Sequence, residues 1–236
     1  MPSSVKVFNL KYPYFPPSNE TFLPPNIIPI GGCDRFSTSL RIFSQQLTSL
    51  VLLPIVISSE FFWPLDSDLT PQNTPYWPHL TSLHILYTPV TPYGKWLFER
   101  NAAEEVYDIE EGPDLSLQLE EDEIPLREDW DTVLFREVPN ARLMNDLYLA
   151  AGRALAKMPR LKEMVLRAQI GGFEHSLMFQ AMDSKASLRL WSTPRFEPEV
   201  TVLDIWREAA KKNTRAKLEI IYLTEGKVQN AKSAMV

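Results

Sequence analysis

The chain has 236 residues, of which 44% are apolar and 23% are charged, and its net charge is −6 at pH 7. These values are typical of a globular protein with a sizeable core, and they exclude a disordered or fibrous chain. The single cysteine, Cys33, excludes an internal disulfide framework and any cysteine-built zinc or iron–sulfur site. Because no stretch approaches the roughly 18 consecutive apolar residues that span a bilayer, we predict a soluble intracellular protein, cytoplasmic or nuclear, without a membrane partner.

The first elements that we predict are a strand, a helix and a second strand. The first strand lies in the segment VKVFNLKYPYF, and the helix covers residues 36–46 with Phe36, Leu40 and Phe43 on its apolar face. The helix leads directly into the hexapeptide LTSLVL at residues 47–52. Alternation within this hexapeptide is typical of a short strand with one buried side.

The hexapeptide LTSLVL has a near copy, LTSLHI, at residues 80–85, and a looser third copy formed by Leu161, Met164 and Leu166. The shared pattern Leu-x-x-Leu-x-Leu is the core signature of a leucine-rich repeat, in which each unit supplies one parallel strand and a returning helix or irregular segment. The intervals between the copies are unequal, so we predict an irregular arrangement rather than a regular solenoid.

A predicted helix precedes the second copy and another precedes the third. The first is a short helix at residues 60–63, capped by Ser58 or Ser59. The second covers residues 140–159 and is stopped by Pro159. Its apolar face comprises Leu143, Leu147, Ala151, Ala154, Leu155 and Met158. The order helix, corner, strand favours parallel strands joined by crossovers.

Charge is distributed unevenly along the chain. Residues 104–131 contain 13 acidic residues and one base, Arg127. We interpret this stretch as part of a solvated acidic loop insertion at about residues 100–138, with a binding surface for a basic partner as the alternative. Its carboxylates at Glu120 to Glu123, Asp129 and Asp131 do not have the spacing of a calcium loop. The lysines and arginines elsewhere are scattered, so we expect no nucleic-acid partner.

The C-terminal part has a different pattern. EHSLMFQAM, ASLRLWST and AKLEIIYL alternate as strands do, and residues 198–213 form an amphipathic helix that carries Val202, Ile205, Trp206 and Ala209. We interpret this region as an atypical α/β cap on the last repeat. The predicted fold class is therefore α/β, with short parallel strands and crossover helices in a leucine-rich-repeat-like arrangement. A single domain covers residues 1–223, and residues 224–236 form a flexible tail.

Three segments resemble the C-terminal region of uncharacterised F-box-like, leucine-rich-repeat proteins of filamentous fungi. They are YWPHLTSLHILYTPVTPYGKW, LMNDLYLAAGRALAKMPRLKEMVL and SLRLWSTPRFEPEVTVLDIWREAA. The matching positions are Trp77, Pro78 and Leu80, then Met158, Pro159 and Leu161, then Trp191 and Trp206. The resemblance implies a domain that holds a target protein, while an N-terminal F-box binds the adaptor of a cullin–RING ubiquitin ligase. The segment LPPNIIP at Leu23 resembles the start of an F-box only weakly. The cullin–RING adaptor is therefore expected as a partner only if an F-box lies upstream.

The candidate binding residues alternate with the core positions of the three strands and would share one strand face. They are Ser49, Val51, Leu53, Ser82, His84, Leu86, Glu163, Val165 and Arg167. Such a ladder suits protein recognition. The alternative is that flanking segments of the chain cover this face. Trp63, Trp77 and Trp96 lie beside prolines or at loop ends, where a tryptophan either locks a corner or stands exposed as a binding anchor.

No catalytic motif is present in the sequence. IGGCD at Ile30 lacks the remainder of a phosphate-binding loop and predicts a turn, and the three histidines lack metal-ligand spacing. We therefore predict a protein–protein recognition module that is not an enzyme, without cofactor or metal, whose target protein is unknown. The alternatives are an enzyme of unknown reaction on an irregular α/β fold and a degenerate paralogue without a partner.

Overall fold

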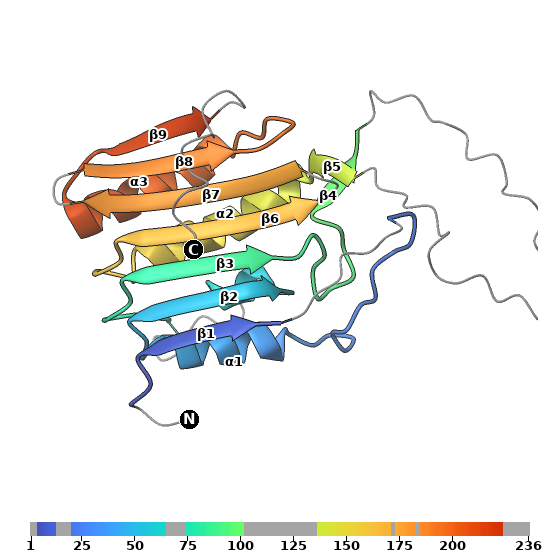
Figure 1. Cartoon of the computed structure of the whole chain (residues 1–236), viewed down its shortest axis with the longest axis horizontal. Coiled ribbons are helices and arrows are strands. Elements are labelled where there is room, and N and C mark those ends of the chain that lie inside the picture. Colours follow the sequence, from blue (N-terminus) through green and yellow to red (C-terminus); the bar gives the residue numbers. More distant parts are fainter. Residues whose placement is uncertain are drawn as a thin grey trace, which may run out of the picture.

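A seven-stranded sheet forms the centre of the molecule (Figure 1). The computed structural model describes residues 4–12, 20–64, 74–101, 136–170, 173–182 and 185–223. The strands lie in the order β1-β2-β3-β6-β7-β8-β9. Their bounds are Val7–Lys11 (β1), Ser49–Ile55 (β2), Ser82–Tyr87 (β3), Glu163–Ile170 (β6), Phe173–Met182 (β7), Lys185–Trp191 (β8) and Leu218–Leu223 (β9). The short strands β4 (Phe98–Arg100) and β5 (Arg136–Pro139) form a separate two-stranded sheet beside the carboxyl end of β6 (Figure 1).

The sheet is mostly parallel, as predicted. Strands β1, β2, β3 and β6 run parallel in sequence order, β7 is antiparallel to both neighbours, and β9 is parallel to β8. The helices α1 (Arg35–Ser44), α2 (Ala141–Leu155) and α3 (Val200–Thr214) all lie behind the sheet in Figure 1, on one face. The α/β class and the crossovers through helices are therefore confirmed. None of the helices in the described part is long and apolar enough to cross a membrane.

The repeated hexapeptides link neighbouring strands at their amino ends. Leu47 and Leu80 are fully buried, and Leu161 is 4% exposed. The next residue in each copy donates its backbone N–H to the preceding unit: Thr48 to the Lys6 carbonyl at 2.7 Å, Thr81 to Thr48 at 2.8 Å and Lys162 to Thr81 at 2.9 Å. The Thr48 and Thr81 hydroxyls donate to these same carbonyls, each at 2.9 Å. The near identity of LTSLVL and LTSLHI therefore reflects equivalent positions in adjacent strands.

The predicted core leucines lie in register across the three strands. Leu50 pairs with Leu83, which pairs with Met164, and the next buried row contains Leu52, Ile85 and Leu166. All six side chains are at most 1% exposed. Burying an aliphatic side chain of this size contributes about 1.5–3 kcal/mol before entropy is counted, so these rows and the helices on them form the main source of stability.

Polar caps begin the first two crossover helices. Asp34 accepts the Ser37 N–H at 3.0 Å at the start of α1, and Asn140 accepts the Leu143 N–H at 3.0 Å at the start of α2. The predicted short helix is a single 3-10 turn at Ser59–Phe61, preceded by Ser58. Ser58 holds the N-cap position, which is one of the two predicted alternatives, but its side chain makes no capping bond, because its hydroxyl donates to Asp34 Oδ2 at 2.8 Å instead.

Other details of the prediction are also corrected. Phe36 is 52% exposed, because it lies on the outer side of α1, whereas Leu40 faces the core. The β4–β5 pair is a finding that the sequence did not predict.

Trp77 and Trp96 lock corners: Trp77 is fully buried and donates to Ser44 Oγ at 2.7 Å, and Trp96 is 7% exposed. The acidic residues 104–131 and the tail 224–236 lie outside the described residues, and the single-domain division remains a prediction.

Candidate functional site: the open face of the sheet

The nine predicted binding residues alternate along their strands with the buried residues that face the helices, so they lie together on the opposite face of the sheet, which is the face toward the viewer in Figure 1. Across β2, β3 and β6, one row contains Ser49, Ser82 and Glu163. A second row contains Val51, His84 and Val165, and Leu86 pairs with Arg167 in a third. Leu53 pairs with Lys11 of β1, because a register shift after Leu52 interrupts its pairing with β3. All nine side chains are partly exposed except Val165, which is 4% exposed.

At the centre of this open face, His84 and Glu163 form a charge-assisted contact. His84 Nε2 lies 2.7 Å from Glu163 Oε2, and Gln180 Nε2 of β7 donates to Glu163 Oε1 at 3.0 Å. Partial burial opposes ionisation of Glu163, but the hydrogen bonds from Gln180 and His84 and the charge of His84 outweigh it, so the pKa of this carboxyl lies below its ordinary value. The carboxylate is therefore held in place, with both oxygens engaged.

A second ion pair lies nearer the carboxyl end of β6. Arg167 Nε is 2.7 Å from Glu174 Oε1 of β7, and the two side chains are 29% and 23% exposed. Together the two contacts engage four polar side chains of this face with one another. What remains available between them is a mixture of hydroxyl and aliphatic groups, which is the composition of a protein-contact surface rather than of a strongly charged one.

The open face continues across β7, β8 and β9, which the sequence analysis did not include in the site. In register with Val165 lie Met178, Arg189 and Ile221, and in register with Arg167 lie Ser176, Trp191 and Leu223. The alternation in EHSLMFQAM and ASLRLWST would have identified these residues, had it been extended beyond the third leucine pattern. Methionine, arginine and tryptophan are the residue types that are enriched at protein interfaces.

A buried polar cluster on the helix side also brings ionisable groups together. Glu60 is 2% exposed; its Oε1 accepts the Asp34 N–H at 3.2 Å and the Tyr93 hydroxyl, and its carbonyl accepts Arg41 Nη1. Burial and then the contact with Glu60 raise the pKa of Tyr93 above its ordinary value. These bonds join α1, the 3-10 turn and the β3–β4 loop. The cluster contains no histidine or cysteine, and its acids act as structural acceptors.

The described residues bring together no set of three potential metal ligands among His, Cys, Asp and Glu. The three histidines lie apart: His79 is exposed, His84 lies on the open face, and His175 is 1% exposed on the helix side. IGGCD forms a turn, with the Gly32 N–H donating to the Pro29 carbonyl at 2.8 Å. The carboxylates at residues 120–131 lie outside the described part.

In a comparison with known protein families, residues 132–236 match a family of unknown function (DUF6546). The matched part includes β5, α2, β6 to β9 and α3, and therefore the half of the open face that contains Glu163, Val165 and Arg167. No curated protein and no solved structure matches the chain. Over residues 132–236 the chain is thus similar to a family whose function is itself unknown.

Proposed function

We propose that the chain is a protein-recognition module whose open sheet face binds a target protein. The observation that carries this proposal is the asymmetry of the sheet: three helices cover one face, and none of the described helices covers the other (Figure 1). Seven strands spaced about 4.8 Å apart span roughly 29 Å, and strands of five to ten residues are about 17 to 33 Å long. A surface of this size is adequate for a protein interface of ordinary area.

The chemistry of the face supports recognition better than catalysis. Ser82, His84 and Glu163 are the nearest approach to a nucleophile, base and acid among the described residues of this face. These three residues lie side by side on the exposed surface of the sheet, and the Glu163 carboxylate also accepts a hydrogen bond from Gln180. A catalytic serine needs a base within hydrogen-bond reach and a cavity that excludes water. Such paired charges on an exposed ladder instead fix side chains in place, which lowers the entropy lost when a partner binds.

We further propose that β1, β2, β3 and β6 form an irregular leucine-rich-repeat-like array, capped by β7 to β9 and α3. Their sequence order, their parallel pairing and the backbone links at Thr48 and Thr81 support it. By the resemblance to F-box-like fungal proteins, the target would be a substrate of a cullin–RING ubiquitin ligase. This part of the proposal is supported by the resemblance alone.

An affinity purification with matched surface variants tests the binding proposal. The full chain is used as bait in an extract of its source organism, beside Leu86→Glu on the open face and Ile42→Glu on the outer side of α1. Ile42 is 62% exposed, so its substitution leaves the sheet untouched. We expect quantitative mass spectrometry to find a protein retained by the wild type and by Ile42→Glu but lost with Leu86→Glu, and direct binding of the purified pair to reproduce that order.

Retention of the same proteins by all three baits would contradict the assignment to the open face. Recovery of a cullin–RING adaptor with the native full-length protein would support the ligase part of the proposal. Its repeated absence, with a target nevertheless bound, would refute that part and leave recognition by the sheet intact.

A further inference from the structure

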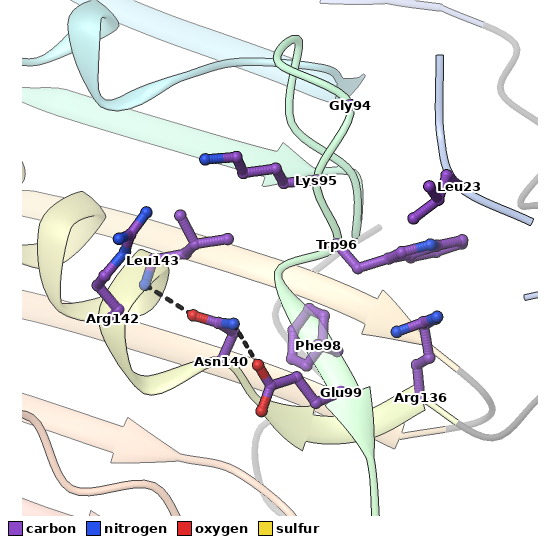
Figure 2. A pocket seen from close by; sticks show the side chains of 10 residues that line it. All are labelled: Leu23, Gly94, Lys95, Trp96, Phe98, Glu99, Arg136, Asn140, Arg142 and Leu143. Atoms are coloured by element: carbon purple, nitrogen blue, oxygen red, sulfur yellow. Dashed lines mark hydrogen bonds between the residues drawn. The ribbon is translucent and has the colours of Figure 1, made fainter. Parts of the chain in front are cut away.

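A separate groove lies at the carboxyl end of the sheet, beside the β4–β5 pair (Figure 2). It has a volume of about 460 Å³ and is lined from several segments that are far apart in the sequence. The residues that define its chemistry are Leu23, Lys95, Trp96, Glu99, Arg136 and Arg142. This volume lies within the range of pockets that hold a small ligand or a few residues of a peptide.

The groove carries more positive than negative charge. Its lining has three cationic side chains and one carboxylate, and that carboxylate, Glu99, accepts a hydrogen bond from Asn140 Nδ2. Arg136 is engaged on its own side of the groove, where its Nε donates to the Glu20 carbonyl at 3.0 Å and its guanidinium lies 4.9 Å from the centre of the Trp96 ring. The groove thus retains two further cations, Lys95 and Arg142.

Lys95 and Arg142 approach the groove from two different elements. Lys95 belongs to the β3–β4 loop and Arg142 to the first turn of α2, and in Figure 2 both side chains lie on the side of the groove away from Arg136. Both residues are exposed, and within the described part of the chain neither has an ion-pair partner. Two cations that are free to move toward the same space favour an anionic occupant.

The opposite side of the groove, where Arg136 lies, is otherwise apolar. Leu23 is 83% exposed and lies over the Trp96 ring in Figure 2, and the neighbouring Phe22 is 69% exposed. Trp96 itself is fixed, because its Nε1 donates to the Phe22 carbonyl at 3.1 Å. Because Trp96 is itself only 7% exposed, the exposed Leu23 beside it supplies most of the apolar surface that gains free energy when it is covered.

We propose that this groove binds an acidic peptide segment of a partner protein, in which a carboxylate side chain lies next to an aliphatic one. The carboxylate would pair with Lys95 and Arg142, and the aliphatic side chain would cover Leu23 and Trp96. A ligand with charge alone, such as inorganic phosphate or a nucleic-acid backbone, would leave the apolar side exposed. The groove is distinct from the nine-residue face, so this inference stands or falls independently of target binding by the open sheet.

Fluorescence anisotropy on the full chain tests the inference with a labelled synthetic peptide of about 12 residues built from repeated Asp-Glu-Leu units. We expect saturable binding that weakens as salt is raised from about 0.05 to 0.5 M. The double variant Lys95→Glu/Arg142→Glu should weaken binding at least about tenfold at low salt, and Leu23→Ser should weaken it about fivefold. Both variants change exposed side chains, and Lys95→Gln/Arg142→Gln gives a milder second test.

The matched control is Arg160→Glu/Lys162→Glu, which reverses one arginine and one lysine at the amino end of β6, where both are exposed. It should change the affinity by less than about twofold. The inference is overturned if the peptide does not bind at about 1 mM. It is equally overturned if the control weakens binding as much as the groove variant, or if a peptide with serine in place of leucine binds equally well. Tighter binding of a uridine oligonucleotide with the same dependence on Lys95 and Arg142 would assign the groove to nucleic acid instead.

Discussion

On strand β3, Leu83 and Leu86 lie on opposite faces of the same sheet. Leu83 faces the helices and is fully buried, whereas Leu86 lies on the open face and is partly exposed. On the helix side the neighbouring rows are almost entirely apolar and in register from β2 to β6. On the open side, apolar residues alternate with serines and ion pairs. One strand therefore provides stability with one set of side chains and a contact surface with the other.

The largest effect that we predict comes from truncating the buried member of that leucine pair. Leu83→Ala should lower the free energy of unfolding by about 2–5 kcal/mol, because it removes three buried carbon atoms and leaves a cavity in the central row. Leu86→Ala on the same strand should cost less than about 1 kcal/mol. Urea unfolding followed by circular dichroism measures both values. Equal losses for the two variants would show that the open face is packed as tightly as the helix side.

The next effect concerns the helix-side contact between the main sheet and the β4–β5 pair. His175 packs against Phe98, with 4.6 Å between the ring centres. Burial lowers the pKa of His175 to about 4, and a hydrogen bond with the Glu137 backbone opposes this shift but is the smaller effect. Because the unfolded chain takes up this proton near pH 6.5 and the native protein only near pH 4, stability should fall as the pH is lowered between these values, by about 3 kcal/mol.

The variant His175→Phe tests this source of pH dependence, since it keeps a ring at the site and cannot titrate. Urea unfolding at pH 7 and at pH 4 should show a smaller loss of stability for the variant than for the wild type, by about 3 kcal/mol. An equal loss in the two proteins would mean that His175 is protonated as easily in the native state as in the unfolded chain.

A smaller effect is expected at the cap of α1. Asp34→Ala removes the acceptor for the Ser37 N–H and for the Ser58 hydroxyl, both of which are buried, so it should cost about 1–2 kcal/mol. The comparison variant is Asp204→Ala on the exposed side of α3, where the aspartate pairs with Arg207 at 2.7 Å. It should cost less than about 0.5 kcal/mol. Thermal unfolding distinguishes the two, and the reverse order would contradict a structural role for the Asp34 cluster.

A further small change in stability is predicted on the open face. Glu163→Gln removes the charge that pairs with His84, but the side chain is 34% exposed, so the loss at pH 7 should be below about 1 kcal/mol. Because the pKa of Glu163 is lowered in the folded protein, this contribution is present above the unfolded value near 4.3 and is lost as the pH falls through the folded value. The stabilities of variant and wild type, measured by urea unfolding, should therefore converge in acid. A deficit that persists at pH 3 would mean that the pair contributes by shape rather than charge.

Much of the architecture was predictable because it depends on local periodicity. The hexapeptides LTSLVL and LTSLHI identified two adjacent strands, and Leu161, Met164 and Leu166 identified the third, since alternation with a buried leucine row is a short-range signal. The same alternation placed His84 on the open face. It did not reveal that His84 contacts Glu163, because that contact joins residues 79 positions apart and depends on register.

The missing parts of the prediction have physical reasons. Strands β4 and β5 are three and four residues long and are separated by a long stretch of chain, so neither carries a periodic pattern of its own. Phe36 was assigned to the core by helical spacing alone, and spacing does not distinguish an inner from an outer stripe when both contain apolar residues. The groove at Lys95 and Arg142 brings together the β3–β4 loop and α2, a contact that sequence spacing does not encode.

Site-specific photo-crosslinking tests the central claim most directly. Val51→benzoylphenylalanine places a reactive group on the open face, and Ile42→benzoylphenylalanine places the same group on the outer side of α1 as the control. In an extract of the source organism, the account predicts a discrete crosslinked protein from position 51 that is absent from position 42 and is lost when Leu86→Glu is added. Crosslinking of the same proteins from both positions, or of none from position 51, would contradict recognition through the open face of the sheet.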